Sequence, residues 1–487
     1  MRTLTAGQFG VALVALSSFL AGCVSIPSHK LSAMPSSASY SMKKSVANSL
    51  LSPVFQSGGW PADDWWKDFG DPELDALVAK ALADNPDLEV AQARLDLAQQ
   101  TVAGVRSALF PEVSANASAI REKFSENGLF PPPIAGSTHT QGQMTLDLAY
   151  HLDLWGQDRA IVRAQLGRAK VAEAEAAQTR LAVASAVAQV YFQLQGDEAR
   201  LAVADESLVQ QKTFRHLVGL RVASGLETQL ALKLAETDVA ADEANIELLR
   251  NSVAHDKYGL AALIGAGPDA AETFSAPAGH FNQPFPLPAS LPIDFVARRP
   301  DVIAKRWQVE SAAEEIGAAR AGFYPNISLT AQFGKQSLDL NRLLDSGSNF
   351  GLFGPAIHLP IFEGGLLRAN LKARYAQYDL AVSQYRKSII DAAREVADRL
   401  ASLASVTREL ARQTEAREAS ESAYDLAVMR YKAGISDYLT VLIVQRDLLA
   451  QRTIEAGLRA RRLQAVTQLI YALGGGYGRD TARPAHP

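Results

Sequence analysis

Residues 85–114 read NPDLEVAQARLDLAQQTVAGVRSALFPEVS, and residues 299–328 read RPDVIAKRWQVESAAEEIGAARAGFYPNIS. The two stretches align without a gap: Pro86 meets Pro300, Arg106 meets Arg320, and Pro111 meets Pro325. Further on, residues 151–156 parallel residues 358–363, and residues 221–225 parallel residues 430–434. Internal repetition of this kind determines the architecture before any single element is considered. We therefore interpret the chain as two copies of one unit.

Each unit is predicted to contain a helix, two strands, a very long helix and a further helix. Proline suits the first position of a helix because its missing N–H would have no partner there. An alanine-rich apolar pattern follows Pro86 as far as about Leu109, where Pro111 ends it. The matching stretch after Pro300 predicts the first helix of the second unit.

The strands are indicated by apolar residues at every second position, which is typical of a half-buried strand. Residues 113–119 alternate small apolar with polar side chains, and residues 327–333 and 353–361 repeat the pattern in the second unit. Turn-rich loops separate the strands of each pair, so we expect two hairpins. The cleanest alternation places one set of residues on an apolar face, namely Leu146, Leu148, Tyr150, Leu152 and Leu154, and another on a polar face, namely Thr145, Asp147, His151 and Asp153.

The helices that follow are too long for an ordinary globular domain. Residues 157–223 and 365–433 contain no proline, and at about 1.5 Å per residue each helix could reach about 100 Å. Apolar residues recur at seven-residue spacing, which indicates coiled-coil packing. Gly225 and Gly434 mark turns into shorter helices, so each unit should end in an antiparallel helical pair. The heptad residues include Val187, Leu194, Leu201 and Leu208 in the first unit and Val382, Ile389, Val396 and Leu403 in the second.

The N-terminus is typical of a targeting segment. Arg2 precedes an apolar run at residues 9–20, which ends in small residues before Cys23, the only cysteine. The sequence Leu20-Ala21-Gly22-Cys23 resembles the lipobox of bacterial lipoproteins, which implies cleavage before Cys23 and acylation of its thiol. The alternative is a plain secretory signal with an incidental cysteine. Val24 stands where an aspartate would resemble an inner-membrane retention signal, and this favours the outer membrane.

These patterns divide the chain into six segments. We expect a signal peptide at 1–22, a lipid-anchored flexible tether at 23–53, a first structural repeat at 54–265, a linker at 266–298, a second repeat at 299–475 and a flexible tail at 476–487. No run of about 18 apolar residues follows Cys23, so no membrane-spanning helix is expected in the mature chain.

Enzymes and nucleic-acid-binding proteins are poorly matched by this sequence. The formal net charge of −4, with both signs interspersed, gives no basic surface for nucleic acid. Motifs of zinc proteases, P-loop proteins and serine hydrolases do not occur in the sequence. The run Gly474-Gly475-Gly476 could suggest a phosphate loop, but it follows a helix and is better read as a helix stop. We predict no enzyme and no cofactor other than the covalent lipid on Cys23.

Several short motifs occur in a fixed order along the chain. They are Trp65-Trp66 with Phe69, Asn85-Pro86-Asp87-Leu88, Leu154-Trp155-Gly156, Arg298-Arg299-Pro300-Asp301, Phe323-Tyr324-Pro325 and the closing Tyr471-Ala472-Leu473-Gly474. As a set they resemble the TolC-type outer-membrane factor family, and within it the NodT-like lipoprotein channels of efflux systems. The resemblance extends from about Leu50 to Tyr477.

The resemblance implies a homotrimer. Each subunit would give four strands to one shared twelve-stranded transmembrane β-barrel, and the long helices would form a hollow periplasmic α-barrel. The strand count agrees independently, because four strands cannot close a barrel alone and an open sheet edge in lipid is very costly.

Two groups of candidate site residues follow. Asp147, His151 and Asp153 share the polar strand face, and we expect them to line the lumen. His151 and His358 occupy matching places in the two units, which could suggest a ligand pair, although polar lumen-lining residues are the favoured interpretation.

The second group is a candidate periplasmic gate after Gly434, formed by Leu439, Ile443, Arg446 and Asp447. By resemblance, Leu439 and Arg446 match positions used for constriction and bonding between protomers. Ile443 stands where many relatives carry an aspartate, which argues against an acidic ring. Asp437 and Asp447 are nearby acids that could face Arg446 or could lie on solvated helix faces.

The function implied is that of an outer-membrane channel subunit in a tripartite efflux system. It would pass small toxic compounds from a periplasmic adaptor and an inner-membrane pump, of the RND type, to the exterior. An exit duct for type I protein secretion is an alternative, and lipidation favours efflux over it. A lipid-anchored coiled-coil scaffold without a pore is an alternative of another class, and the polar strand face argues against it.

Overall fold

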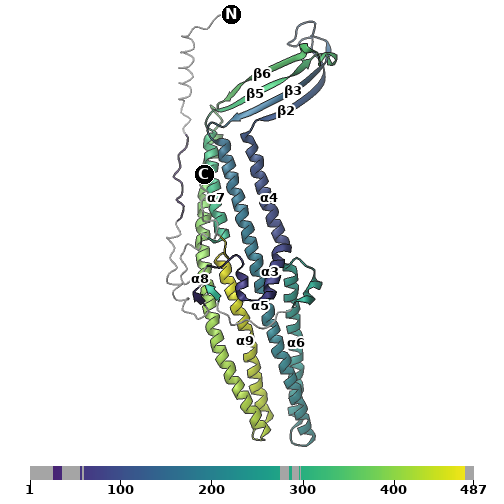
Figure 1. Cartoon of the computed structure of the whole chain (residues 1–487), viewed down its shortest axis with the longest axis vertical. Helices are drawn as coiled ribbons and strands as arrows, with labels where there is room; N and C mark the ends of the chain where they lie inside the picture. Colours follow the sequence, from purple (N-terminus) through teal and green to yellow (C-terminus); the bar gives the residue numbers. More distant parts are fainter. Residues whose placement is uncertain are drawn as a thin grey trace. The chain divides into compact units, whose positions relative to one another are not determined.

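The computed structural model describes residues 26–35, 55–57, 60–274, 285–287, 296 and 298–477 (Figure 1). The expected signal peptide, Cys23 and most of the expected C-terminal tail lie outside these residues. The chain forms two compact units, each described by itself. Within the described residues, the first unit takes in residues 26–34, 96–170 and 306–384, and the second unit takes in the remainder.

The first unit contains a four-stranded antiparallel sheet (Figure 1). The strand order is β2-β3-β5-β6, so each predicted hairpin is confirmed and β3 pairs with β5 to join them. The strands are β2 (Glu112–Lys123), β3 (Thr138–Leu152), β5 (Asn326–Ser337) and β6 (Asn349–His358).

The pairing register confirms the predicted division into two faces. Leu148 on β3 lies opposite Val113 and Ala331, whereas its neighbour Asp147 lies opposite Ser114 and Gln332. Opposed residues in an antiparallel sheet share a face, so an apolar face and a polar face extend across the strands. Leu352 on β6 is an exception, because it opposes Gln332 on the polar face.

Two strands end earlier than expected. β3 stops at Leu152 and β6 at His358, so Asp153, Leu154 and Ile361 lie beyond the sheet. After β6, Pro360 has no N–H to donate to a ladder. After β3, the chain turns at Gly156, whose φ of 75° is in the left-handed region.

The long helices match the prediction closely. α5 (Gln157–Ala223) and α8 (Leu366–Lys432) contain 67 residues each, and α6 (Gln229–Leu263) and α9 (Tyr438–Ala472) contain 35 each. The shorter helices α4 (Pro86–Arg106) and α7 (Pro300–Ala321) begin at the predicted prolines. Heptad residues such as Val187, Leu194, Val382 and Val396 are completely buried. None of the helices in the described part of the chain is both long and apolar enough to cross a membrane.

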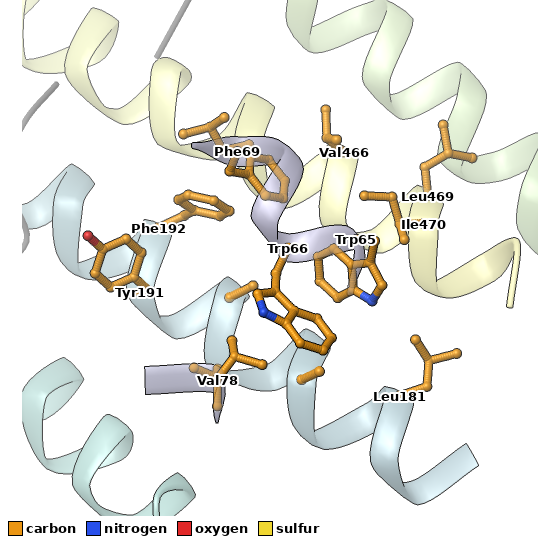
Figure 2. Close-up of a cluster of buried hydrophobic side chains, with 14 of the residues drawn as sticks. Trp65, Trp66, Phe69, Val78, Leu181, Tyr191, Phe192, Val466, Leu469 and Ile470 are labelled. Atoms are coloured by element: carbon orange, nitrogen blue, oxygen red, sulfur yellow. The ribbon is translucent and has the colours of Figure 1, made fainter. Parts of the chain in front are cut away.

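The core of the second unit is built around aromatic side chains from a segment whose structure was not predicted (Figure 2). A 3₁₀ turn, η2 (Trp65–Phe69), buries Trp65, Trp66 and Phe69 against Phe192 of α5 and Ile470 of α9. Helix α3 (Pro72–Asp84) follows, and Asp71 caps it by accepting the N–H groups of Glu73 and Leu74. Tyr191 of α5 donates its hydroxyl to the other oxygen of Asp71 at 2.7 Å, which ties the cap to the long helix.

Three further short elements precede the second repeat. A parallel pair joins β1 (Phe55–Ser57) to β4 (Phe285–Leu287), and a 3₁₀ turn, η4 (Pro268–Thr273), follows α6. The region expected as a linker at 266–298 therefore contains ordered elements. Because these elements are so short, no periodic pattern in the sequence predicted them.

At the end of α9 the glycine run ends the helix, as predicted. Gly474, Gly475 and Gly476 all have positive φ, and a Cβ on Gly474 would lie 2.4 Å from the carbonyl oxygen of Arg298. Arg299 ties the end of α9 to the start of α7 and to α8. Its guanidinium donates to the Ala472 carbonyl at 2.7 Å and contacts Asp301 and Glu395.

Candidate functional site

The polar face of the sheet centres on Asp147. Its carboxylate accepts hydrogen bonds from Asn116 of β2 at 2.8 Å, Thr145 of β3 at 2.7 Å and Gln332 of β5 at 2.5 Å. Three donors from three strands hold the carboxylate in one orientation and satisfy an acceptor-only group. The structure thus places Asp147 on the polar face that the alternation predicted.

The expectation that Asp153 is a strand residue is wrong. Asp153 follows the end of β3, and its carboxylate accepts the backbone N–H groups of Asp158 and Arg159 at 3.2 and 3.1 Å. It also accepts the Arg159 side chain at 3.0 Å. A carboxylate just before a helix can accept the free N–H groups of the first helical turn. Asp153 does this for α5, so it belongs to the start of that helix and not to the sheet.

His151 lies in β3, and its Nδ1 is hydrogen-bonded to Asp158 in the first turn of α5 at 2.5 Å. It opposes Ser328, whereas His358 opposes Asn326 across the other side of β5. The structure does not bring the two histidines together as a ligand pair. Among the described residues, no group of three or more His, Cys, Asp or Glu side chains is arranged to hold a metal ion.

The turns at the far ends of the long helices are built alike in the two repeats. After α5, Gly225 has φ of 71°, and the Leu226 N–H donates to the Arg221 carbonyl at 2.8 Å. After α8, Gly434 has φ of 73°, and the Ile435 N–H donates to the Arg430 carbonyl at 3.0 Å. These bonds satisfy carbonyl groups at the helix end, and glycine adopts the left-handed conformation without a Cβ penalty.

A small apolar cluster packs the helical pairs together next to these turns. Tyr438 at the start of α9 is buried, its ring lies 5.8 Å from Tyr431 and 5.7 Å from Phe214, and burial raises the pKa of its hydroxyl. The Arg221 guanidinium lies 5.1 Å from the centre of the Tyr431 ring. The cluster is Val218, Ala235, Ala427, Tyr431, Tyr438, Val441 and Leu442.

The four predicted gate residues share one exposed face of α9. Leu439 is 53% exposed, Ile443 is 55% exposed, and Arg446 and Asp447 are also exposed. Their spacing of four, seven and eight residues brings them onto one side of a helix. The opposite side of α9 packs into the cluster described above. The single chain therefore presents this face outward.

Arg446 pairs with an acid that the sequence analysis did not name. Its guanidinium lies 2.9 Å from the Asp238 carboxylate on α6, and Asp238 is only 16% exposed. Asp437 instead caps α9, accepting both the N–H and the hydroxyl of Thr440, and these bonds hold the pKa of its carboxyl below the usual range. Of the two alternatives left open for Asp437, facing Arg446 or lying on a solvated helix face, neither describes its place within the chain, because its carboxylate is bonded to Thr440 at the start of α9.

A network of ion pairs, also not predicted, lies further along the same helices. Arg452 of α9 contacts Glu206 of α5 at 3.2 Å and Glu421 of α8 at 2.6 Å. Arg417 of α8 contacts Glu421 and the buried Glu455 of α9. The spacing of Arg417 and Glu421 could have indicated a pair within one helix. The contacts between helices depend on tertiary packing.

The comparisons with known proteins agree with this architecture. The sequence profile of the outer membrane efflux protein family matches residues 77–266 and 291–475. The chain belongs to the outer membrane efflux protein family. The two matched segments are separated by a gap that contains β4.

Relatives and solved structures cover most of this outer membrane efflux protein. The toluene efflux pump outer membrane protein TtgC of Pseudomonas putida is 32% identical, with 95% of each chain covered. The multidrug resistance outer membrane protein MdtP of Escherichia coli is 31% identical, with 86% of this chain and 88% of MdtP covered. The outer membrane protein VceC of Vibrio cholerae is 33% identical with a TM-score of 0.78, covering 86% of this chain and all of VceC.

Proposed function

We propose that three copies of this outer-membrane efflux protein assemble into one channel. The chain contributes a sheet with one polar and one apolar face, and β2 and β6 are the edge strands of that sheet among the described residues. Unpaired strand edges in lipid are very costly, and pairing β6 of one copy with β2 of the next removes them. The polar face around Asp147 then lines water.

The assembled channel passes small organic compounds that a periplasmic adaptor and an inner-membrane pump deliver to it. Relatives named for toluene efflux and multidrug resistance support this class of substrate. The observation that carries the proposal is the combination of a two-faced sheet and two equal helical pairs in one chain. Such a chain needs no chemistry of its own, so we propose a conduit and not an enzyme.

The lipobox-like sequence supports an acyl anchor on Cys23 in the outer membrane, with the helices extending into the periplasm. The gate proposed at the helix turns consists of Leu439, Ile443, Arg446 and Asp447. Its support is their shared exposed face on α9 and the contact of Arg446 with α6.

Two measurements test the proposal. Purified protein in a planar bilayer should give discrete single-channel conductance, and a preparation denatured before reconstitution should give none. Expression with a cognate pump in a strain that lacks its own outer-membrane channel should restore resistance to small compounds. Secretion of a protein substrate without restored resistance would instead indicate a type I duct. Absence of conductance from an intact oligomer would indicate a scaffold without a pore.

A further inference from the structure

Charged side chains are separated by sign between the two faces of the sheet. Residues that oppose one another, and alternate residues along a strand, share a face. The register therefore places three carboxylates on the polar face, those of Glu112, Glu122 and Asp147. It places three cations on the apolar face, which we call the loop-end cations, namely Arg121, Lys123 and Lys335. Within the four strands, the apolar face carries no Asp or Glu and the polar face carries no Lys or Arg.

The loop-end cations all lie at one end of the sheet. Arg121 and Lys123 are at the end of β2, and Lys335 is two residues before the end of β5. The loops between the paired strands lie at this end, whereas the other end leads into the helices (Figure 1). Under the proposed function the helices extend into the periplasm. The loop-end cations then lie where the apolar face reaches the outer leaflet of the membrane.

Two of these cations are equivalent residues of the two repeats. The gap-free alignment that pairs Pro86 with Pro300 also pairs Arg121 with Lys335. Each cation follows four apolar-face residues of its strand, which are Val113, Ala115, Ala117 and Ala119 in β2 and Ile327, Leu329, Ala331 and Phe333 in β5. The strands of a closed barrel tilt together, so equivalent residues of two repeats reach the same depth in the membrane. Each copy therefore presents a cation from both repeats at one level.

The charge of the loop-end cations is not neutralised within the described part of the chain. Lys335 Nζ donates to two backbone carbonyls of the following loop at 3.0 and 3.1 Å, and these groups carry no net charge. The nearby Asp345 carboxylate pairs with Arg342 instead, at 3.7 Å. An ammonium group has three donor hydrogens, so one remains for a ligand. Arg121 and Lys123 are exposed, and no carboxylate among the described residues pairs with them.

We propose that the loop-end cations bind the headgroup of an outer-leaflet glycolipid that carries two phosphates, as lipid A does. The site rests on the proposed function, which places the loop end of the sheet outside the cell. A guanidinium binds phosphate through two parallel hydrogen bonds, and an ammonium group adds a compact positive charge. Arg121 and Lys123 lie on one face of β2 about 7 Å apart, so one headgroup can contact both. A lipid with a single phosphate would leave part of this charge unmatched.

Titration of the purified protein in detergent with diphosphoryl lipid A, followed by native mass spectrometry, tests the site. The double variant Arg121→Gln with Lys123→Gln should bind lipid A about thirtyfold more weakly, because each cation near an anionic lipid surface contributes about fivefold. Arg106→Gln is the matched control, since it removes an exposed cation before the opposite end of β2 and should leave the affinity unchanged. Wild-type affinity in the double variant, or an equal loss in the control, overturns the site.

The same titration with monophosphoryl lipid A and with phosphatidylglycerol identifies the lipid. Diphosphoryl lipid A should bind most tightly, and its affinity should fall as the salt concentration rises. Equal affinity of wild type for phosphatidylglycerol and for diphosphoryl lipid A overturns the assignment to a lipid with two phosphates.

Bilayer conductance of the same preparations separates this site from the proposed channel. The double variant should conduct like wild type, because the loop-end cations lie on the face that meets lipid and not on the polar face. Conductance without binding of lipid A would overturn the lipid site alone. Absence of conductance from wild type would overturn the channel, and with it the placement of the loop-end cations at the outer leaflet.

Discussion

Asp256 on α6 carries a carboxyl group that is hydrogen-bonded to Asp197 on α5. Burial, together with the charge of Asp197, raises the pKa of Asp256 to about 7 from an ordinary value of 3.8. Between these two values the folded protein keeps a proton that the unfolded chain releases. The free energy of unfolding should therefore fall as the pH rises through this window, and it should change no further above it.

The first prediction replaces this acid with a group that cannot ionise. Asp256→Asn should unfold at a higher temperature than wild type at pH 8, while at pH 5 the two proteins should unfold at nearly the same temperature. Thermal melting of the purified protein at both pH values is the measurement. Glu247→Gln is the control, because that exposed side chain pairs with Arg250 on the surface of the same helix. A difference between Asp256→Asn and wild type that does not depend on pH would contradict the shared proton.

Arg446 supports a second prediction at this scale. It neutralises Asp238, which stands near Asp242, whose own pKa is raised by burial and by the Asp238 charge. Arg446→Glu would leave three acids facing one another between α6 and α9. An exposed pair is worth only about 0–1 kcal/mol, but symmetry in an oligomer repeats it. We expect higher single-channel conductance from Arg446→Glu than from wild type.

Two further variants make that measurement specific. The exchanged pair Asp238→Arg with Arg446→Asp should bring the conductance back toward wild type. Arg250→Glu, which reverses an exposed charge on α6, should leave it unchanged. If Arg446→Glu conducts like wild type with the oligomer intact, closure depends instead on apolar packing by residues such as Leu439.

At the scale of the elements, glycines with the same left-handed conformation have different surroundings. Gly434 and Gly474 both have positive φ, but a Cβ on Gly434 would meet no atom within 4 Å, whereas one on Gly474 would meet a backbone carbonyl. Gly434→Ala should therefore cost only the left-handed strain, about 1–2 kcal/mol. Gly474→Ala should cost clearly more. Thermal melting in detergent compares them, and equal losses would contradict the close approach at the end of α9.

The strands give a prediction about accessibility. In a Cys23→Ser background, single cysteines at Thr145 and Asp147 should react with a membrane-impermeant thiol reagent in reconstituted protein. Cysteines at Leu146 and Leu148 should resist it, because the apolar face meets lipid. Asp153 is not a useful position, since it caps α5 outside the strand. Equal labelling of both sets would mean that the strands are shifted in register.

The sequence predicted the long periodic helices, including their ends, far better than it predicted the ends of the strands. The prediction for α5 has the observed bounds, and α8 differs from its prediction by one residue at each end, because uninterrupted heptads leave little choice. The end of β3 was missed because the Asp153 side chain bonds to the following helix, and alternation does not reveal that contact. Asp238 was missed as the partner of Arg446 because the two residues are 208 positions apart and meet only through tertiary packing.

At the scale of the whole molecule, the acyl anchor and the sheet should act independently. Cys23→Ser should abolish acylation, and the channel should still assemble and conduct, because apolar strand faces drive insertion into the membrane. Palmitate labelling and bilayer conductance of the same preparation measure both properties. Labelling that survives the change would refute the anchor, and loss of conductance with the anchor would show that insertion depends on lipid.

The equal lengths of α5 and α8, and of α6 and α9, have a consequence for natural variation in this family. Removing seven residues from α5 alone would draw its turn back by about 10 Å while the turn after α8 stayed in place. The apolar cluster beside the turns contains residues from both helical pairs and would then lose its partners. Insertions and deletions in one half should therefore be tolerated only when the other half has changed by the same number of heptads. Among homologous sequences, the length of the α5–α6 pair should therefore correlate with the length of the α8–α9 pair.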